Sequence, residues 1–107
     1  MYYVKTTMTK KFDEVFHLQY CEVPDDLWVP RCVEEKWNGS LGYADSENPD
    51  GFNDAFLPEK PFPKKSELFD DNGLCKLDSE GEFAAVLITK NEFEAVWARA
   101  LKENAKK

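Results

Sequence analysis

The sequence predicts an α+β fold, a small antiparallel sheet of four to five short strands with a C-terminal amphipathic helix and room for one short helix packed on one face. Three observations predict it. An apolar run of strand type, Phe83–Ile88, leads directly into a helix pattern; Tyr2–Met8 is rich in β-formers; and turn signals separate short apolar segments. At 107 residues, we expect residues 1–107 to form a single domain.

The first half of the predicted sheet is a hairpin. Tyr2–Met8 is rich in Tyr, Val and Thr and is typical of a strand. Phe12–Val23 fits two structures: as a strand, apolar and polar residues alternate from Phe16 to Tyr20, whereas as a helix its apolar face is interrupted by Gln19. We favour the strand, which pairs Tyr2–Met8 with Val15–Val23.

The middle of the chain is predicted to be the least regular part. Pro24-Asp25-Asp26 breaks the strand pattern, and a short helix is expected at Pro30–Trp37, with proline in its first turn and Asn38-Gly39 at its end. Residues 40–65, rich in Pro, Gly and Asp, predict an irregular loop region, with one helical turn in Gly51–Leu57.

From Glu67 onward the pattern indicates a meander followed by the helix. Turns are expected at Asp70–Gly73 and Asp78–Gly81, on either side of a strand at Leu74–Leu77, with Phe83–Ile88 as the next strand. Thr89 and Glu92 have the spacing of a capping box. The helix that follows carries one apolar stripe, made of Phe93, Val96, Trp97, Ala100 and Leu101.

The charge of the chain is acidic and uneven. Of the net charge of −7, residues 12–59 contribute −10, because twelve acids stand there against only Arg31 and Lys36. Eight of the fifteen aromatic residues lie in the same block. Such a surface repels nucleic acid and anionic membranes and attracts a basic protein surface, which is the partner we expect.

Eight residues of this block are the candidate partner-binding set. Four acids flank two tryptophans, and two phenylalanines follow in the irregular region; aromatic residues of this kind often anchor interfaces. The set is Asp25, Asp26, Trp28, Glu34, Glu35, Trp37, Phe52 and Phe56.

No catalytic, cofactor or metal residue is predicted. Adjacent acid pairs such as Asp70-Asp71 do not supply two carboxylates that converge across a cleft. His17, Cys21, Cys32 and Cys75 include the donor types of a Cys₃His zinc site, but no C-x-x-C spacing is present, and free cysteines more often act as small buried apolar residues.

We therefore expect a non-enzymatic, acidic protein-binding module that occupies a basic surface on another protein, of the inhibitor, immunity or nucleic-acid-mimic type. The alternative is a small metal-binding or Cys/His-dependent enzyme domain, and a third option is a structural subunit of an assembly. No apolar run is long enough to span a membrane, no leader pattern is present, and the three cysteines are odd in number, so we expect a cytoplasmic protein.

Overall fold

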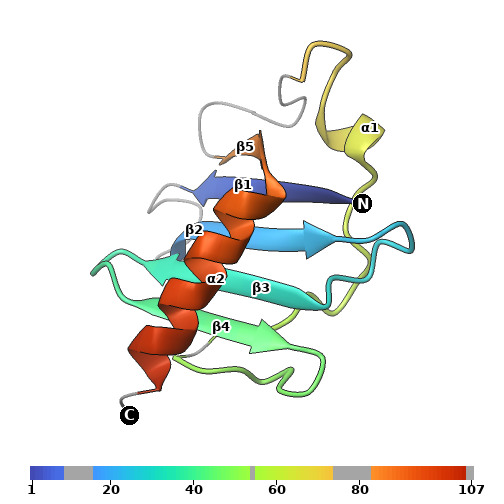
Figure 1. Cartoon of the computed structure of the whole chain (residues 1–107). Coiled ribbons are helices and arrows are strands. Elements are labelled where there is room, and N and C mark those ends of the chain that lie inside the picture. Colours follow the sequence, from blue (N-terminus) through green and yellow to red (C-terminus); the bar gives the residue numbers. More distant parts are fainter. Residues whose placement is uncertain (9–15, 54, 74–82, 106–107) are drawn as a thin grey trace.

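The computed structural model describes residues 1–8, 16–53, 55–73 and 83–105. One antiparallel sheet, ordered β4-β3-β2-β1-β5, contains five strands: β1 (Tyr2–Met8), β2 (Phe16–Val23), β3 (Arg31–Lys36), β4 (Leu41–Asp45) and β5 (Phe83–Ile88) (Figure 1). The helices are α1 (Lys65–Leu68) and α2 (Lys90–Asn104). The predicted α+β class is confirmed, as are the β1–β2 hairpin and the strand assignment of β2.

The register of the sheet aligns one residue from every strand in a single row. Val4 of β1 lies opposite Cys21 of β2 and, on its other side, opposite Leu87 of β5. Cys21 lies opposite Cys32 of β3, which in turn lies opposite Ala44 of β4. Because side chains alternate between the two faces of a strand, the whole row points to one face of the sheet.

Helix α2 covers the other face. Figure 1 shows it running across the sheet from the β5 side to the β4 side. Val96 and Ala100 are buried against Val33 of β3 and Leu41 of β4. Leu101, which the sequence pattern placed in the stripe, is exposed. Asn104, which is not part of the predicted stripe, is buried and donates a 2.9 Å hydrogen bond to the Leu41 carbonyl.

The start of α2 has the predicted cap. The Glu92 backbone N–H donates to Thr89 Oγ1 at 3.1 Å, and the Thr89 N–H donates to Glu92 Oε1 at 3.3 Å. Both otherwise unpaired donors at the helix end are therefore satisfied locally.

Residues 55–63, which we call the strap, cover the face that carries the row. Leu57 and Phe62 pack there, against a core that includes Val4, Cys21 and Cys32. The strap contains no helix or strand, as expected for this proline-rich stretch. Figure 1 shows the segment between β4 and α1 passing behind the sheet. The sheet is thus buried on both faces, by a helix on one and by irregular chain on the other.

The helix predicted at Pro30–Trp37 is wrong, because this segment is strand β3. The adjacent residues Cys32 and Val33 of this strand are both fully buried, Cys32 toward the strap and Val33 toward α2. A strand buried on both faces loses the alternation of apolar and polar residues that identifies a half-buried strand. Pro30 precedes the strand, where no ladder donor is required.

The irregular region predicted at about 40–65 is also too long, because β4 occupies its start. A Cβ at Gly42 would lie 2.5 Å from the Phe52 carbonyl oxygen, so the glycine permits the later chain to approach β4. The helical turn expected in Gly51–Leu57 is replaced by a bridge, in which the Phe52 N–H donates to the Tyr43 carbonyl at 2.8 Å.

The predicted turn at Asp70–Gly73 is confirmed, since the Gly73 N–H donates to the Asp70 carbonyl at 3.0 Å and Gly73 has a φ of 78°. The strand expected at Leu74–Leu77 and the turn at Asp78–Gly81 lie outside the described residues.

Truncating the buried end of the stripe should destabilise the fold. Phe93 is fully buried, so we expect Phe93→Ala to cost about 3–5 kcal/mol of unfolding free energy, as for other core aromatics. Leu101→Ala, on the exposed flank of the same helix, is the control and should cost less than about 1 kcal/mol. Chemical denaturation measures both; equal losses would mean that α2 does not pack through Phe93.

Candidate partner-binding surface

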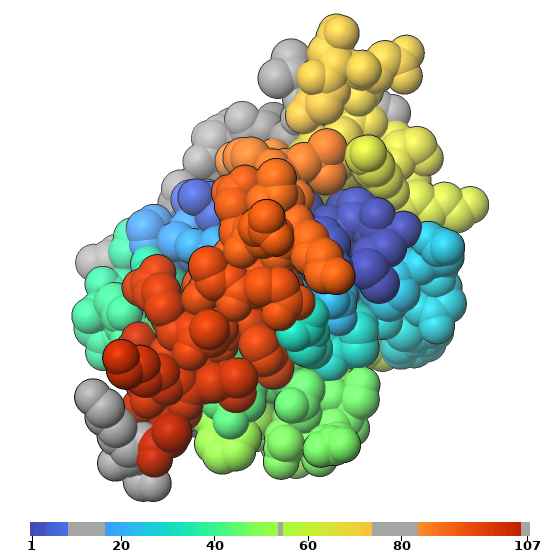
Figure 2. Space-filling view, viewed as in Figure 1, coloured from blue at the N-terminus to red at the C-terminus, as the bar shows by residue number. Residues whose placement is uncertain are grey.

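Two loops from different strand pairs lie at the same end of the sheet. The β2–β3 turn carries Asp25 and Asp26, and the end of β4 carries Asp45 and Glu47. We call these four acids the acidic end. Because Arg31, the first residue of β3, pairs with Asp45, the end of β4 lies at the same end of the sheet as the β2–β3 turn. Figure 2 shows the two segments, in cyan and green, on the same side of the molecule.

Each loop is folded by one of its own carboxylates. In the β2–β3 turn, the Trp28 N–H donates to Asp26 Oδ1 at 3.0 Å, and the Leu27 N–H donates to the Pro24 carbonyl at 3.0 Å. After β4, Asp45 Oδ1 accepts from the backbone N–H groups of Glu47 and Asn48 at 3.0 and 2.8 Å. Asp and Asn form such local turns readily, so the acids both shape and charge these loops.

Asp25 forms an ion pair with the amino terminus of the chain. Its Oδ1 lies 2.6 Å from the amino group of Met1, and its side chain is 95% exposed. This hydrogen bond lowers the pKa of the Asp25 carboxyl below its ordinary value. The carboxylate is therefore ionised and faces solvent.

Trp28 is the large aromatic residue of the acidic end. It is 52% exposed, whereas the next residue, Val29, is buried in the core beneath the strap. The turn therefore anchors itself through Val29 and leaves the indole ring in solvent, beside Asp25 and Asp26. An exposed tryptophan in a turn that also carries acidic residues is typical of the residues that anchor protein interfaces.

A pocket of about 380 Å³ opens at the acidic end. It is lined by Glu22, Pro30, Arg31, Asp45, Ser46 and Glu47. Of the lining residues that the structure describes, Arg31 is the one cation, and Glu22 matches it, so Asp45 and Glu47 leave this pocket with an excess of negative charge. A basic side chain is the ligand that such a pocket favours electrostatically.

Arg31 is held by two carboxylates and two rings. Its Nη2 and Nε donate to Glu22 at 2.6 and 3.1 Å, and its Nη2 also donates to Glu94 of α2 at 2.5 Å. The guanidinium carbon lies 5.0 Å from the Phe93 ring centroid and 5.1 Å from that of Trp97. These hydrogen bonds raise the pKa of Arg31 and lower that of Glu94. The network ties α2 to β2 and β3.

The other predicted site residues do not join the acidic end. Glu34 is buried, and its Oε1 accepts from Gln19 Nε2 at 3.2 Å, so it is not exposed as a residue of a partner-binding surface would be. Glu35 is partly buried, with Oε2 3.8 Å from His17 Nδ1. Trp37 stacks on His17 at 4.3 Å. The cause is the strand: alternation directs Glu34 and Glu35 to opposite faces of the sheet.

The two phenylalanines of the predicted set are exposed but lie elsewhere. Phe52 stacks on Tyr43 at the outer edge of β4, with ring centroids 4.6 Å apart. Phe56 belongs to the strap, on the opposite face from α2. Of the eight predicted residues, the structure therefore groups Asp25, Asp26 and Trp28.

Sequence reasoning missed Asp45 and Glu47. Their place beside Arg31 depends on the pairing of β3 with β4, and neither strand was predicted. One signal was present in the sequence: Leu41 and Tyr43 alternate with the small residues Gly42 and Ala44, which is typical of a strand.

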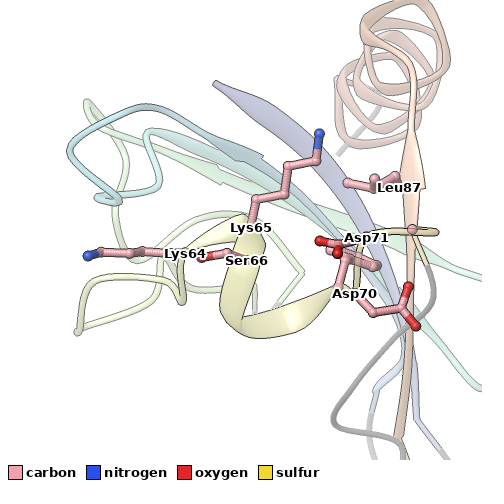
Figure 3. Close-up of a pocket in the computed structure, with 8 residues that line it drawn as sticks. Lys64, Lys65, Ser66, Asp70, Asp71 and Leu87 are labelled. Carbon is pink, nitrogen blue, oxygen red and sulfur yellow. The ribbon is translucent and has the colours of Figure 1, made fainter.

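A larger pocket, of about 590 Å³, lies between α1 and β5 (Figure 3). Its lining includes Lys65, Asp71 and Leu87, and Figure 3 shows Lys64 extending away from the other labelled side chains. Its charged side chains are of both signs and exposed, and the lining residues that the structure describes include no histidine or cysteine. We assign it no chemistry.

The donors of the possible zinc site do not gather in the described structure, because Cys21 and Cys32 lie opposite one another in the core whereas His17 lies apart from them. His17 sits at a bulge in β2 and stacks on Trp37, whereas Cys21 and Cys32 are buried beneath the strap; Cys75 lies outside the described residues. Among the residues described, no group of three or more His, Cys, Asp and Glu could hold a metal ion. Absence of zinc from the purified protein stays a prediction.

Comparison with known proteins gives no relative. No family model matches the chain, and neither the curated proteins nor the solved structures contain a significant match. In the described part of the chain, no helix is long and apolar enough to cross a membrane.

Removing Arg31 should be costly, because Glu22 would remain nearly buried without its cation. We expect Arg31→Ala to lower the unfolding free energy by about 3 kcal/mol, in the range seen when one partner of a buried ion pair is removed. The control Arg99→Ala, at an exposed position of α2, should cost less than about 0.5 kcal/mol. Similar losses in urea denaturation would show that the network contributes little.

The Arg31–Glu94 contact should make stability depend on pH. The pKa of Glu94 is lowered in the folded protein, so its stabilising effect is full above the ordinary glutamate pKa and is lost as pH falls through the folded value. The stability difference between the wild type and Glu94→Gln should therefore shrink below about pH 4. In an Arg31→Ala background the same comparison should show a much smaller pH dependence, because only Lys90 then remains to lower the pKa of Glu94; an undiminished effect there would assign it to another group.

Proposed function

We propose that this protein is a non-enzymatic binding module that occupies a basic surface on another protein through its acidic end. One observation carries the proposal: two turns at the same end of the sheet carry four carboxylates, and one of these turns also exposes Trp28. The net charge of −7 supports the same partner chemistry.

The internal pairing of Arg31 strengthens the argument. Glu22 and Glu94 already neutralise this cation, so it does not offset Asp45 and Glu47 toward an incoming partner. Complementary charge accelerates encounter with a basic surface, and the indole ring of Trp28 adds apolar contact once the partner has docked.

The proposal covers inhibitors, immunity proteins and nucleic-acid mimics, which share this way of binding. It includes a cytoplasmic location, which is supported by Cys21 and Cys32 being free thiols, as expected in a reducing compartment.

The test is association kinetics with a basic partner captured from source-cell extract at low salt and then purified. The double variant Asp25→Lys/Glu47→Lys should associate about tenfold more slowly than the wild type at low salt, and the wild-type rate should fall as salt screens the charges. Trp28→Ala should mainly accelerate dissociation, because it removes contact area rather than charge.

The matched control is Glu59→Lys/Asp71→Lys, which makes the same change in charge at two exposed acids away from the acidic end. It should slow association less than about threefold. The proposal fails if no basic protein is retained, or if both double variants associate at the same rate.

A further inference from the structure

Two thiols face one another in the core beneath the strap. Cys21 of β2 lies directly opposite Cys32 of β3, and both side chains belong to the row on the strap-covered face. Both are free and fully buried. The proposed partner binding at the acidic end uses neither residue, so any role of this pair is independent of that proposal.

The pairing geometry suits a covalent bond. Residues directly opposite in antiparallel strands have Cα atoms about 4.5 or 5.5 Å apart, and disulfides span Cα distances of about 4.4–6.8 Å. The two side chains project from the same face, so side-chain rotation with small backbone adjustment suffices to join the sulfur atoms. The strands need not change register.

The strap controls access to these thiols. Cys32 Sγ donates to the Phe56 carbonyl of the strap at 3.3 Å. The strap is further held by the Phe62 N–H, which donates to the Leu27 carbonyl at 2.7 Å, and by packing of Leu57 and Phe62 on the core. A segment held by isolated hydrogen bonds and a few side chains opens more readily than a paired strand does.

Closure also suppresses the reactivity of the thiols. Burial raises the pKa of Cys32 to about 12 and raises that of Cys21 well above its ordinary value. Because the thiolate is the reactive form, both cysteines are protected while the strap is closed. When the strap opens, water reaches the sulfurs and this burial effect is lost.

We propose that Cys21 and Cys32 are a redox modification site, at which a small-molecule disulfide such as glutathione disulfide oxidises the pair to a cross-strand disulfide when the strap opens. One thiol loses a proton, and its thiolate attacks a glutathione sulfur, which forms a mixed disulfide and releases one glutathione thiolate. The second protein thiolate then attacks the mixed disulfide and releases the second glutathione. The protein loses two protons and two electrons, and glutathione disulfide takes up the electrons.

Oxidation has a structural consequence for the strap. A disulfide sulfur carries no proton, so Cys32 can no longer donate to the Phe56 carbonyl. The oxidised protein therefore closes its strap less tightly than the reduced protein does. The site couples the redox state of two core thiols to the exposure of residues 55–63.

The experiment uses the full chain with Cys75→Ser, which leaves Cys21 and Cys32 as the two cysteines. After incubation with glutathione disulfide, non-reducing mass spectrometry should find the Cys21 and Cys32 peptides linked. Phe62→Ala, which weakens the strap, should accelerate this reaction about tenfold, whereas Leu101→Ala on α2 should leave the rate within about twofold of its parent. Protease cleavage within residues 55–63 should be faster in the oxidised protein.

Two further measurements keep the test decisive. If Phe62→Ala unfolds, the parent is oxidised in urea concentrations below its unfolding transition, where strap opening should again raise the rate. Cys21→Ala in the same background should stop at the mixed disulfide on Cys32, because the second thiol is absent. Free thiols that persist under strap-opening conditions, or a mixed disulfide as the sole product of the parent, would overturn the proposal.

Discussion

The guanidinium of Arg31 is the contact on which the arrangement of helix and sheet depends. It joins Glu22 of β2, its own strand β3 and Glu94 of α2 through charge-assisted hydrogen bonds, and it lies over the Phe93 and Trp97 rings. Apolar packing favours burial of α2 but is not directional. The planar, five-donor guanidinium adds direction, because only a narrow set of helix positions lets both carboxylates reach it.

The two faces of the sheet are covered by different kinds of structure, and the two coverings therefore differ in stability. The α2 face is closed by a capped helix whose backbone hydrogen bonds are internal. The opposite face is closed by the strap, whose backbone relies on isolated contacts such as that between Phe62 and Leu27. The same row of small residues, Cys21, Cys32 and Ala44, lets irregular chain lie close to the sheet. We therefore expect the strap to open more easily than the face that α2 covers.

Sequence patterns predicted the elements whose signals are local. The Thr89–Glu92 capping box, the stripe of α2 and the β-formers of β1 each lie within one element, and each was identified. Strand β3 was mistaken for a helix because Cys32 and Val33 are both buried, which removes the period of two. The acidic end was half predicted: Asp25, Asp26 and Trp28 are close in sequence, whereas Asp45 joins them only through its pairing with Arg31. No local pattern reports such a pairing.

The charge that a partner would meet is the charge that remains after internal pairing, and this differs from the distribution along the sequence. Glu34 belongs to the acidic block but is buried, and Glu22 is committed to Arg31. These two acids are therefore not part of the charge that a partner would meet. Arg31 is one of the two cations in residues 12–59. Because Glu22 and Glu94 neutralise it, it does not reduce the negative charge that a partner would meet at the acidic end. Burial and pairing thus remove Glu22 and Glu34 from the acidity of this segment. The acids that stay exposed include Asp26 and Glu47 of the acidic end, Asp25, which is paired with the Met1 amino group, and also Asp50 and Glu59.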